Sequence, residues 1–271
     1  MLDLLTTPLP WPGFGGVTPA ALATLLLAAA AAGLVDAIVG GGGLILIPTL
    51  LLFLPGGEAI YSVATNKLAA IVGTASAAVA YARRVEIDRG QTAAMAVAAF
   101  AGSIGGALLA ASLPSRVLTA VVLVALVAVG LYTWRRPALG LVHAPRFGRG
   151  AQLAVLLAGG VAIGFYDGLA GPGTGSFLVF LLVGLVGFAF LGASASAKIV
   201  NTATNAGALA FFLPAGVVLV GLGAVLAVAN VAGSVLGARV AVARGSAFVR
   251  RVFLGVVSVL IVTLAVRLVV S

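Results

Sequence analysis

Four charged side chains lie within or beside long apolar runs of this 271-residue chain: Asp36, Lys67, Asp167 and Lys198. A charge at the centre of a bilayer costs at least about 2.5 to 3.5 kcal/mol on insertion scales, so such residues normally face the protein interior and mark a pathway. The alternative is a buried Asp–Lys ion pair in each half of the chain that merely pins two helices together. A pathway is the default interpretation for ionisable groups at membrane depth.

Polar side chains flank both lysines and indicate what such a pathway binds. On a helix, three of them follow Lys198 at positions i+3, i+4 and i+7 and share its face. Lysine supplies positive charge and amide or hydroxyl groups fix orientation, which together suit an oxyanion. Hydrogen bonding between helices is the alternative role for these groups. The candidates are Thr65 and Asn66 beside Lys67, and Asn201, Thr202 and Asn205 after Lys198.

Glycine-rich breaks follow both aspartates, at residues 40–43 and 171–175. Unwound backbone at membrane depth survives only where protein or water covers it, and interrupted helices in two corresponding halves point to a midplane binding site. Helices that begin after these breaks would aim free N–H groups and a positive dipole end at an anion. Tight helix packing is the alternative for residues 40–43. The candidate binding glycines are Gly42, Gly43, Gly173 and Gly175.

An internal repeat relates these features at one offset of 131 residues, the difference between positions 36 and 167. Lys67 and Lys198 are the only lysines, and they obey the same offset. Residues 101–103 and 232–234 both read Ala-Gly-Ser, and Gly106 matches Gly237. Because lysine is rare in this chain, the lysine match is stronger evidence for a repeat than the alanine and glycine matches. The glycine pairs spaced by four, Gly102 with Gly106 and Gly233 with Gly237, predict close helix contacts.

Each half contains five hydrophobic pieces, which predicts an all-α polytopic transmembrane bundle of two repeats. A bilayer span needs about 20 apolar residues, whereas the piece after each break is shorter and is expected to form a half-helix. The predicted organisation is a first repeat at residues 1–134, a basic linker at 135–150 and a second repeat at 151–271. The pieces are 20–39, 44–54, 59–82, 92–111 and 117–134, then 151–170, 176–191, 193–213, 223–242 and 248–268.

Composition excludes a soluble protein, because 62% of residues are hydrophobic and 8% are charged, against about a quarter charged in an ordinary soluble domain. The formal net charge of +9 comes from arginines in short loops, which indicates retention on the cytoplasmic side rather than nucleic-acid binding. If the short pieces cross the membrane, nearly all arginines fall inside and the halves are inverted. If they are re-entrant, the arginines at 239–251 face outward, so we expect inverted repeats.

Catalytic and metal sites have little support in the sequence. There is no cysteine, and the single histidine, His143, lies in the arginine-rich central loop, where a solvated side chain is the expected state. An intramembrane hydrolase would need paired acids or a Ser–His or metal constellation. We therefore expect no enzyme activity, no metal and no cofactor. A structural or assembly protein is the remaining alternative, but it leaves the duplicated buried charges unexplained.

The repeat, its first-span aspartate, its glycine break and the stretch Ala64-Thr65-Asn66-Lys67-Leu68 resemble the sulfite exporter family (TauE/SafE-like permeases). The resemblance covers nearly the whole chain. It implies export of sulfite, sulfoacetate or a related C2 sulfonate and a place in the bacterial cytoplasmic membrane. The second half departs from the motif, because Ser196 and Ala197 occupy the positions of Thr65 and Asn66, so Asn201 or Asn205 is expected to supply the second amide.

Together these observations predict a secondary transporter that exports a small sulfur oxyanion by alternating access. Lys67 and Lys198 are expected to bind the anion in one pocket, while Asp36 and Asp167 either carry coupling protons or hold the lysines. The expected partners are the anion, the lipid bilayer and a second copy of the chain in a homodimer, with no nucleic acid. A permease for another small anion or solute is the main alternative.

Overall fold

The computed structural model describes residues 7–55, 58–118, 120–121, 124 and 146–270, and its regular structure over these residues is helical. This confirms the predicted all-α fold. In chain order the elements are α2 (Pro19–Val39), α3 (Gly43–Phe53), α4 (Ala59–Ala82), α5 (Arg89–Ser112), α7 (Arg149–Leu169), α8 (Thr174–Phe180), the π-helix η1 (Leu181–Val186), α9 (Phe190–Phe212) and α10 (Val220–Val270).

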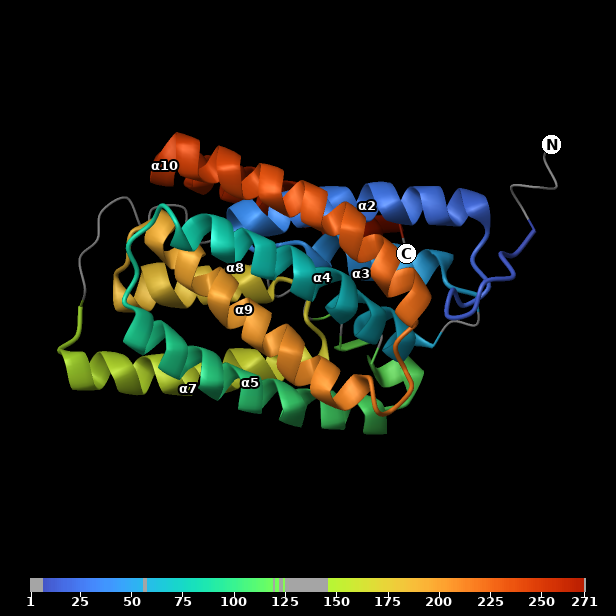
Figure 1. Ribbon diagram of the computed structural model, residues 1–271, viewed down its shortest axis with the longest axis horizontal. Helices are drawn as coiled ribbons and strands as arrows, with labels where there is room; N and C mark the ends of the chain where they lie inside the picture. Colours follow the sequence, from blue (N-terminus) through green and yellow to red (C-terminus); the bar gives the residue numbers. More distant parts are fainter. Residues whose placement is uncertain (1–6, 56–57, 119, 122–123, 125–145, 271) are drawn as a thin grey trace.

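The long helices form three layers (Figure 1). α2 and α10 pack together on one side, α5 and α7 pack together on the other, and α4 and α9 lie between them. The short helices α3 and α8 lie inside this arrangement, next to α2 and α9 respectively. The interior therefore contains the helices that carry both lysines and the short helices that follow the glycine breaks.

Membrane spans are recognisable by length and composition among the described residues. Five helices or parts of helices are long and apolar enough to cross a bilayer: Pro19–Val39, Ala59–Ala82, Arg89–Ser112, Arg149–Leu169 and Val220–Gly245. α9 is equally long, but its apolar character is interrupted by Lys198 and several amide and hydroxyl side chains. α3 has 11 residues, so it is about 16 Å long and falls short of the roughly 30 Å hydrocarbon layer.

Local signals explain where the first helix begins and ends. The hydroxyl of Thr18 accepts a hydrogen bond from the N–H of Ala21, and Pro19 occupies the first turn, where its missing N–H costs nothing. The helix stops at Gly40, whose φ of 86° is left-handed and whose N–H donates to the carbonyl of Asp36. Asp36 therefore lies in the last turn of α2, directly before the break.

The second short piece ends earlier than the sequence predicts. The apolar run suggested a single piece over 176–191, yet the structure has α8, then η1, and then a turn at Gly187 with a φ of 97°. α9 begins at Phe190 rather than at Ala193. Continuous hydrophobicity conceals this turn, because a glycine with left-handed backbone ends a helix without any change in polarity.

The two halves interlock instead of packing as separate bundles. A Cβ on Gly106 of α5 would lie 1.9 Å from the carbonyl oxygen of Phe165 in α7, and one on Gly237 of α10 would lie 2.5 Å from the carbonyl oxygen of Leu34 in α2. Both glycines and both partners are related by the 131-residue offset. Each predicted close helix contact is therefore observed, and each joins one half to the other.

The last predicted piece of each half is 117–134 in the first and 248–268 in the second. Most of 117–134, and with it the boundary between the first repeat and the linker, falls outside the described residues. The piece at 248–268 lies in α10, which continues past residue 245 through a kink at Gly245, where φ is 70° and ψ is −172°.

Candidate functional site

Both lysines are buried at equivalent depths in their helices. Lys67 and Lys198 are each eight residues from the start of their helix, α4 and α9, which is about 12 Å along the axis. Their exposed fractions are 1% and 0%. Since an unpaired ammonium group at such a position would be very costly, each lysine requires a partner.

The partners come from the opposite halves of the chain. The Nζ atom of Lys67 lies 2.8 Å from Oδ2 of Asp167 in α7, and the Nζ atom of Lys198 lies 2.8 Å from Oδ2 of Asp36 in α2. The 131-residue offset exchanges one pair for the other. The alternative that each half contains its own Asp–Lys pair is therefore wrong: the pairs cross between the repeats.

The glycine breaks meet at the same place. A Cβ on Gly40 would lie 2.2 Å from the carbonyl carbon of Gly175, and the N–H of Ser176 donates to the carbonyl of Gly40 over 3.0 Å. A Cβ on Gly171 would lie 2.8 Å from Nζ of Lys67. Both Gly40 and Gly171 have a φ of 86°. Glycine is required here for the backbone conformation and for the space that the neighbouring backbone and lysine occupy.

Two N–H groups at the starts of the short helices bond to protein groups. The N–H of Gly42 donates to Oδ1 of Asp36 over 3.4 Å, and in the second break the N–H of Ser176 is taken by Gly40. Within the described structure these amides are therefore satisfied by protein groups. They tie the first break to Asp36 and the second break to Gly40 of the first.

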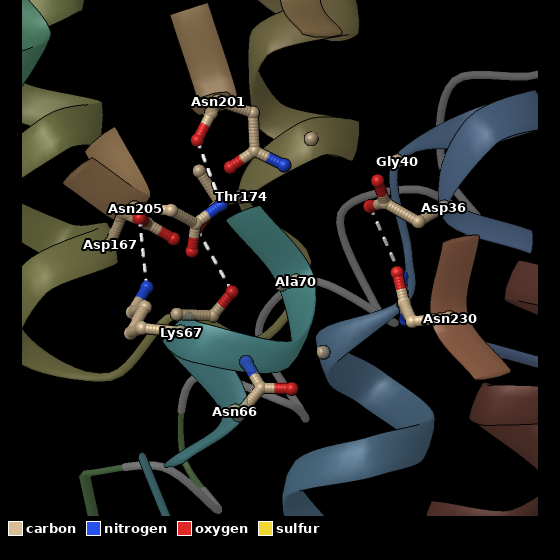
Figure 2. A pocket seen from close by; sticks show the side chains of 14 residues that line it. Asp36, Gly40, Asn66, Lys67, Ala70, Asp167, Thr174, Asn201, Asn205 and Asn230 are labelled. Atoms are coloured by element: carbon tan, nitrogen blue, oxygen red, sulfur yellow. Dashed lines mark hydrogen bonds and ion pairs between the residues drawn. The ribbon is translucent and has the colours of Figure 1, made fainter. Parts of the chain in front are cut away.

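A small pocket lies where the two breaks and the ion pairs meet (Figure 2). It has a volume of about 20 Å³, which suffices for about one water molecule. Figure 2 shows Lys67 directed at Asp167, with Asn201 and Asn205 nearby on α9 and Asp36 on the other side of the pocket. The lining residues are Asp36, Gly40, Gly42, Gly43, Asn66, Lys67, Ala70, Asp167, Gly171, Thr174, Gly175, Asn201, Asn205 and Asn230.

Four of the candidate residues do not line the pocket. Lys198 is fully enclosed beside Asp36, and Gly173 only caps α8. The Thr65 hydroxyl accepts a hydrogen bond from the N–H of Leu219, and the Thr202 hydroxyl donates to the carbonyl of Lys198. The helical face predicted for α9 is therefore divided, because its two amides reach the pocket while its hydroxyl is turned back to the backbone.

The remaining amides are held by hydrogen bonds that orient them. Oδ1 of Asn201 accepts a bond from the Thr204 hydroxyl, and Nδ2 of Asn205 donates to the carbonyl of Asn201. The Asn66 side chain comes from α4, next to Lys67, and is 5% exposed. With Asn230 of α10, the pocket thus combines one ammonium group with amides from three helices.

Two polar lining residues were not predicted from the sequence. Asn230 lies in α10, where Nδ2 donates to the carbonyl of Ala29 and Oδ1 accepts from the hydroxyl of Ser234. Its counterpart in the first half is Ala99, so the repeat gives no signal, and only its polarity within an apolar run does. Thr174 lies in the second break, where its hydroxyl donates to the carbonyl of Gly171.

Metal binding has no obvious site within the described residues, which hold no group of three or more histidine, cysteine, aspartate or glutamate side chains. The carboxylates of Asp36 and Asp167 are instead occupied by the lysines. The side chains at the centre can therefore form ion pairs and hydrogen bonds.

Interrupted helices that enclose a buried, charged pocket between two related halves are typical of membrane transporters. Residues 25–264 match the family described as "Sulfite exporter TauE/SafE". The chain is 37% identical over 222 residues to "Probable membrane transporter protein ORF9" of Sinorhizobium sp., with 82% of each chain covered.

Two further relatives carry similar names. "Probable membrane transporter protein YfcA" of Escherichia coli (strain K12) is 35% identical over 204 residues, which cover 75% of this chain and 74% of the relative. A "Probable membrane transporter protein" of Haemophilus influenzae is 34% identical over 207 residues, with 75% and 78% covered. No solved structure gives a significant match. The chain belongs to the sulfite exporter TauE/SafE family of bacterial membrane transporters.

Proposed function

We propose that this protein exports a small sulfur oxyanion, such as sulfite, sulfoacetate or a related C2 sulfonate, across the bacterial cytoplasmic membrane. The observation that carries the proposal is the pocket at the junction of both glycine breaks, which Lys67 lines together with Asn66 and Asn201. An ammonium group supplies charge and amides supply directed donors, which suits a sulfonate or sulfite group. The family description supports the same class of solute.

The anion binds by taking the place of a carboxylate. In the closed pocket Asp167 neutralises Lys67, so the centre carries no excess positive charge. An arriving anion would displace Asp167 from Lys67, or Asp167 would accept a proton as the anion enters. In both cases the transported anion replaces the Asp167 carboxylate as the partner of Lys67. The ammonium group therefore does not have to be desolvated anew in each transport cycle.

Transport requires the pocket to open, because its volume of about 20 Å³ is far below the several hundred Å³ of ordinary ligand sites. We propose alternating access, in which the two halves rock about the crossed ion pairs and open the pocket to one side at a time. The halves would be inverted, as the distribution of arginines favours. The Lys198–Asp36 pair, which the anion does not replace, would keep the halves in register while the periphery moves.

The direction of transport follows from the negative charge of the solute. A membrane potential that is negative inside contributes about 2.3 kcal/mol per charge per 100 mV, which drives an anion outward. Export of a monovalent sulfonate therefore needs no nucleotide. A different small anion remains the alternative substrate within the same mechanism, and assembly as a homodimer stays a prediction.

Flux measured in proteoliposomes tests the proposal. Purified protein is expected to accelerate efflux of sulfite or sulfoacetate from the vesicles. The efflux rate is expected to rise when a potential is applied that is positive outside the vesicles. Lys67→Ala is expected to abolish flux. Taurine, a C2 sulfonate whose ammonium group makes it a zwitterion of zero net charge, serves as the matched control and should move slowly, because the proposal requires a net negative charge. Equal flux of taurine and sulfoacetate, or full flux in Lys67→Ala, would refute the proposal.

A further inference from the structure

A second concave surface, distinct from the central pocket, lies between the end of α4 and the middle of α10. Its volume is about 700 Å³. α4 contributes positions 76, 79, 80, 83 and 84, and α10 contributes positions 235, 238, 239, 242 and 243. Both sets follow the spacing i, i+3, i+4, i+7 and i+8, so each is a continuous stripe on one helix face. We call this surface the α4–α10 groove.

Small side chains make the groove hollow. The two helices touch closely at Gly73, where an added Cβ would lie 1.8 Å from Oδ1 of Asn230 and 2.7 Å from the hydroxyl oxygen of Ser234. The groove begins directly after this contact, and Ala80, Ala238 and Ala243 are among its lining residues. The contact at Gly73 lies between the groove and the central pocket.

Positive charge lies at the end of the α4 stripe and in the middle of the α10 stripe. Arg83, Arg84 and Arg239 are exposed and line it, and the lining includes no acidic side chain. The ion pairs formed within the described part of the chain are those of the two buried lysines, so these arginines have no carboxylate partner there. α4 is a candidate span that ends at Ala82, which puts Arg83 and Arg84 at the membrane surface, whereas Arg239 lies within the candidate span Val220–Gly245, six residues before its end.

The equivalent surface in the other half lacks these arginines. The 131-residue offset relates Arg83 to Pro214, Arg84 to Ala215 and Arg239 to Leu108. The repeat architecture alone therefore does not require a basic groove. It is a feature of one end of the molecule.

We propose that the α4–α10 groove binds an anionic phospholipid, with the phosphate on the three arginines and an acyl chain along the small residues. Arginines match phosphate by bidentate hydrogen bonds, and basic pockets between transmembrane helices bind anionic headgroups. The occupant is a lipid rather than the transported anion because apolar side chains such as Val79, Ala80 and Ala238 line the groove beside the arginines. This inference does not rest on the identity of the exported solute.

Competition binding on the purified full-length protein in detergent tests it, with fluorescent phosphatidylglycerol as the probe. Unlabelled phosphatidylglycerol should displace the probe about a hundredfold more effectively than phosphatidylcholine, since each basic residue contributes about fivefold. The triple variant Arg83→Gln, Arg84→Gln, Arg239→Gln should lose this preference. The charge-matched triple Arg116→Gln, Arg149→Gln, Arg251→Gln should keep it, because these exposed arginines lie outside the groove.

A second variant tests the acyl-chain part of the site. Ala80→Phe fills the groove and leaves the arginines, so it should weaken phosphatidylglycerol binding at least tenfold. Thermal unfolding of each variant checks that it is folded. Equal loss of preference in both triple variants, displacement of the probe by inorganic phosphate or sulfite at the same concentration as the lipid, or unchanged binding in Ala80→Phe would each overturn the proposal.

Discussion

The ammonium group of Lys67 lies 2.8 Å from the carboxylate of Asp167, a residue of the other repeat 100 positions along the chain. The equivalent contact between Lys198 and Asp36 closes the arrangement. Each half of the protein thus supplies the counter-ion that the other half needs at membrane depth. Neither half can bury its lysine alone, so the crossed pairs tie the assembly of the two repeats to the formation of the pocket.

Removing one partner of such a pair is expected to destabilise the protein. Lys67→Met leaves Asp167 buried without a counter-charge and should cost about 3 to 5 kcal/mol of unfolding free energy. The double variant Lys67→Met, Asp167→Leu removes both charges and should recover most of this loss. Unfolding in detergent, followed by circular dichroism against denaturant, measures the difference. If the double variant is no more stable than the single one, the two residues do not act as a pair.

Gly171 is expected to tolerate substitution less well than other glycines with left-handed backbone. Gly171→Ala would place a Cβ 2.8 Å from Nζ of Lys67, which should displace the lysine and lower flux at least tenfold. Gly216→Ala is the matched control, because Gly216 has a φ of 71° and nothing within 4 Å of an added Cβ. Both variants should lose about 1 kcal/mol or more of stability from backbone strain. Equal flux in the two variants would argue against a role for the Gly171 contact.

Close packing between the halves makes Gly106 sensitive to size. Gly106→Ala introduces a Cβ 1.9 Å from a backbone carbonyl oxygen of α7, and such overpacking typically costs about 1 to 3 kcal/mol. Gly192→Ala, in α9 with open space around it, should be neutral or slightly stabilising. Thermal unfolding in the same detergent compares the two. A neutral Gly106→Ala would contradict the interlocked arrangement of α5 and α7.

The inverted relation of the repeats predicts a difference between equivalent positions. Arg84→Cys and Ala215→Cys are related by the 131-residue offset and both positions are exposed. We expect the first to react with a membrane-impermeant maleimide only from the cytoplasmic side and the second only from outside. The chain contains no cysteine, so background labelling is absent. Labelling of both sites from the same side would rule out inversion.

The amide of Asn66 should contribute to affinity. Asn66→Ala removes a donor beside Lys67 and is expected to raise the KM for the exported anion roughly tenfold, in the range of one hydrogen bond to a charged group. Thr202→Val, which alters a hydroxyl that bonds only to the α9 backbone in the described structure, should leave KM within about twofold. Flux at several anion concentrations gives both values, and similar KM changes in the two variants would remove Asn66 from the site.

The sequence predicted the helical class and the repeat well, because both follow from composition and from rare residues such as the two lysines. It could not predict how Lys67 and Asp167 pair, since that contact depends on how two halves pack and not on spacing within one. The sequence also did not show that the Thr202 hydroxyl donates to the backbone of its own helix, because helical periodicity identifies a shared face but not a rotamer. Asn230 was missed because it lies on a helix whose repeat counterpart carries alanine.

Efflux of sulfoacetate from proteoliposomes that contain the double variant Lys67→Met, Asp167→Leu tests the central claim most directly. This variant removes the proposed anion-binding charge and its counter-ion together, so it should fold. We predict that it unfolds at a temperature near that of the unaltered protein and transports no sulfoacetate. A folded double variant that transports at the unaltered rate would show that the Lys67–Asp167 pair is a structural tie alone.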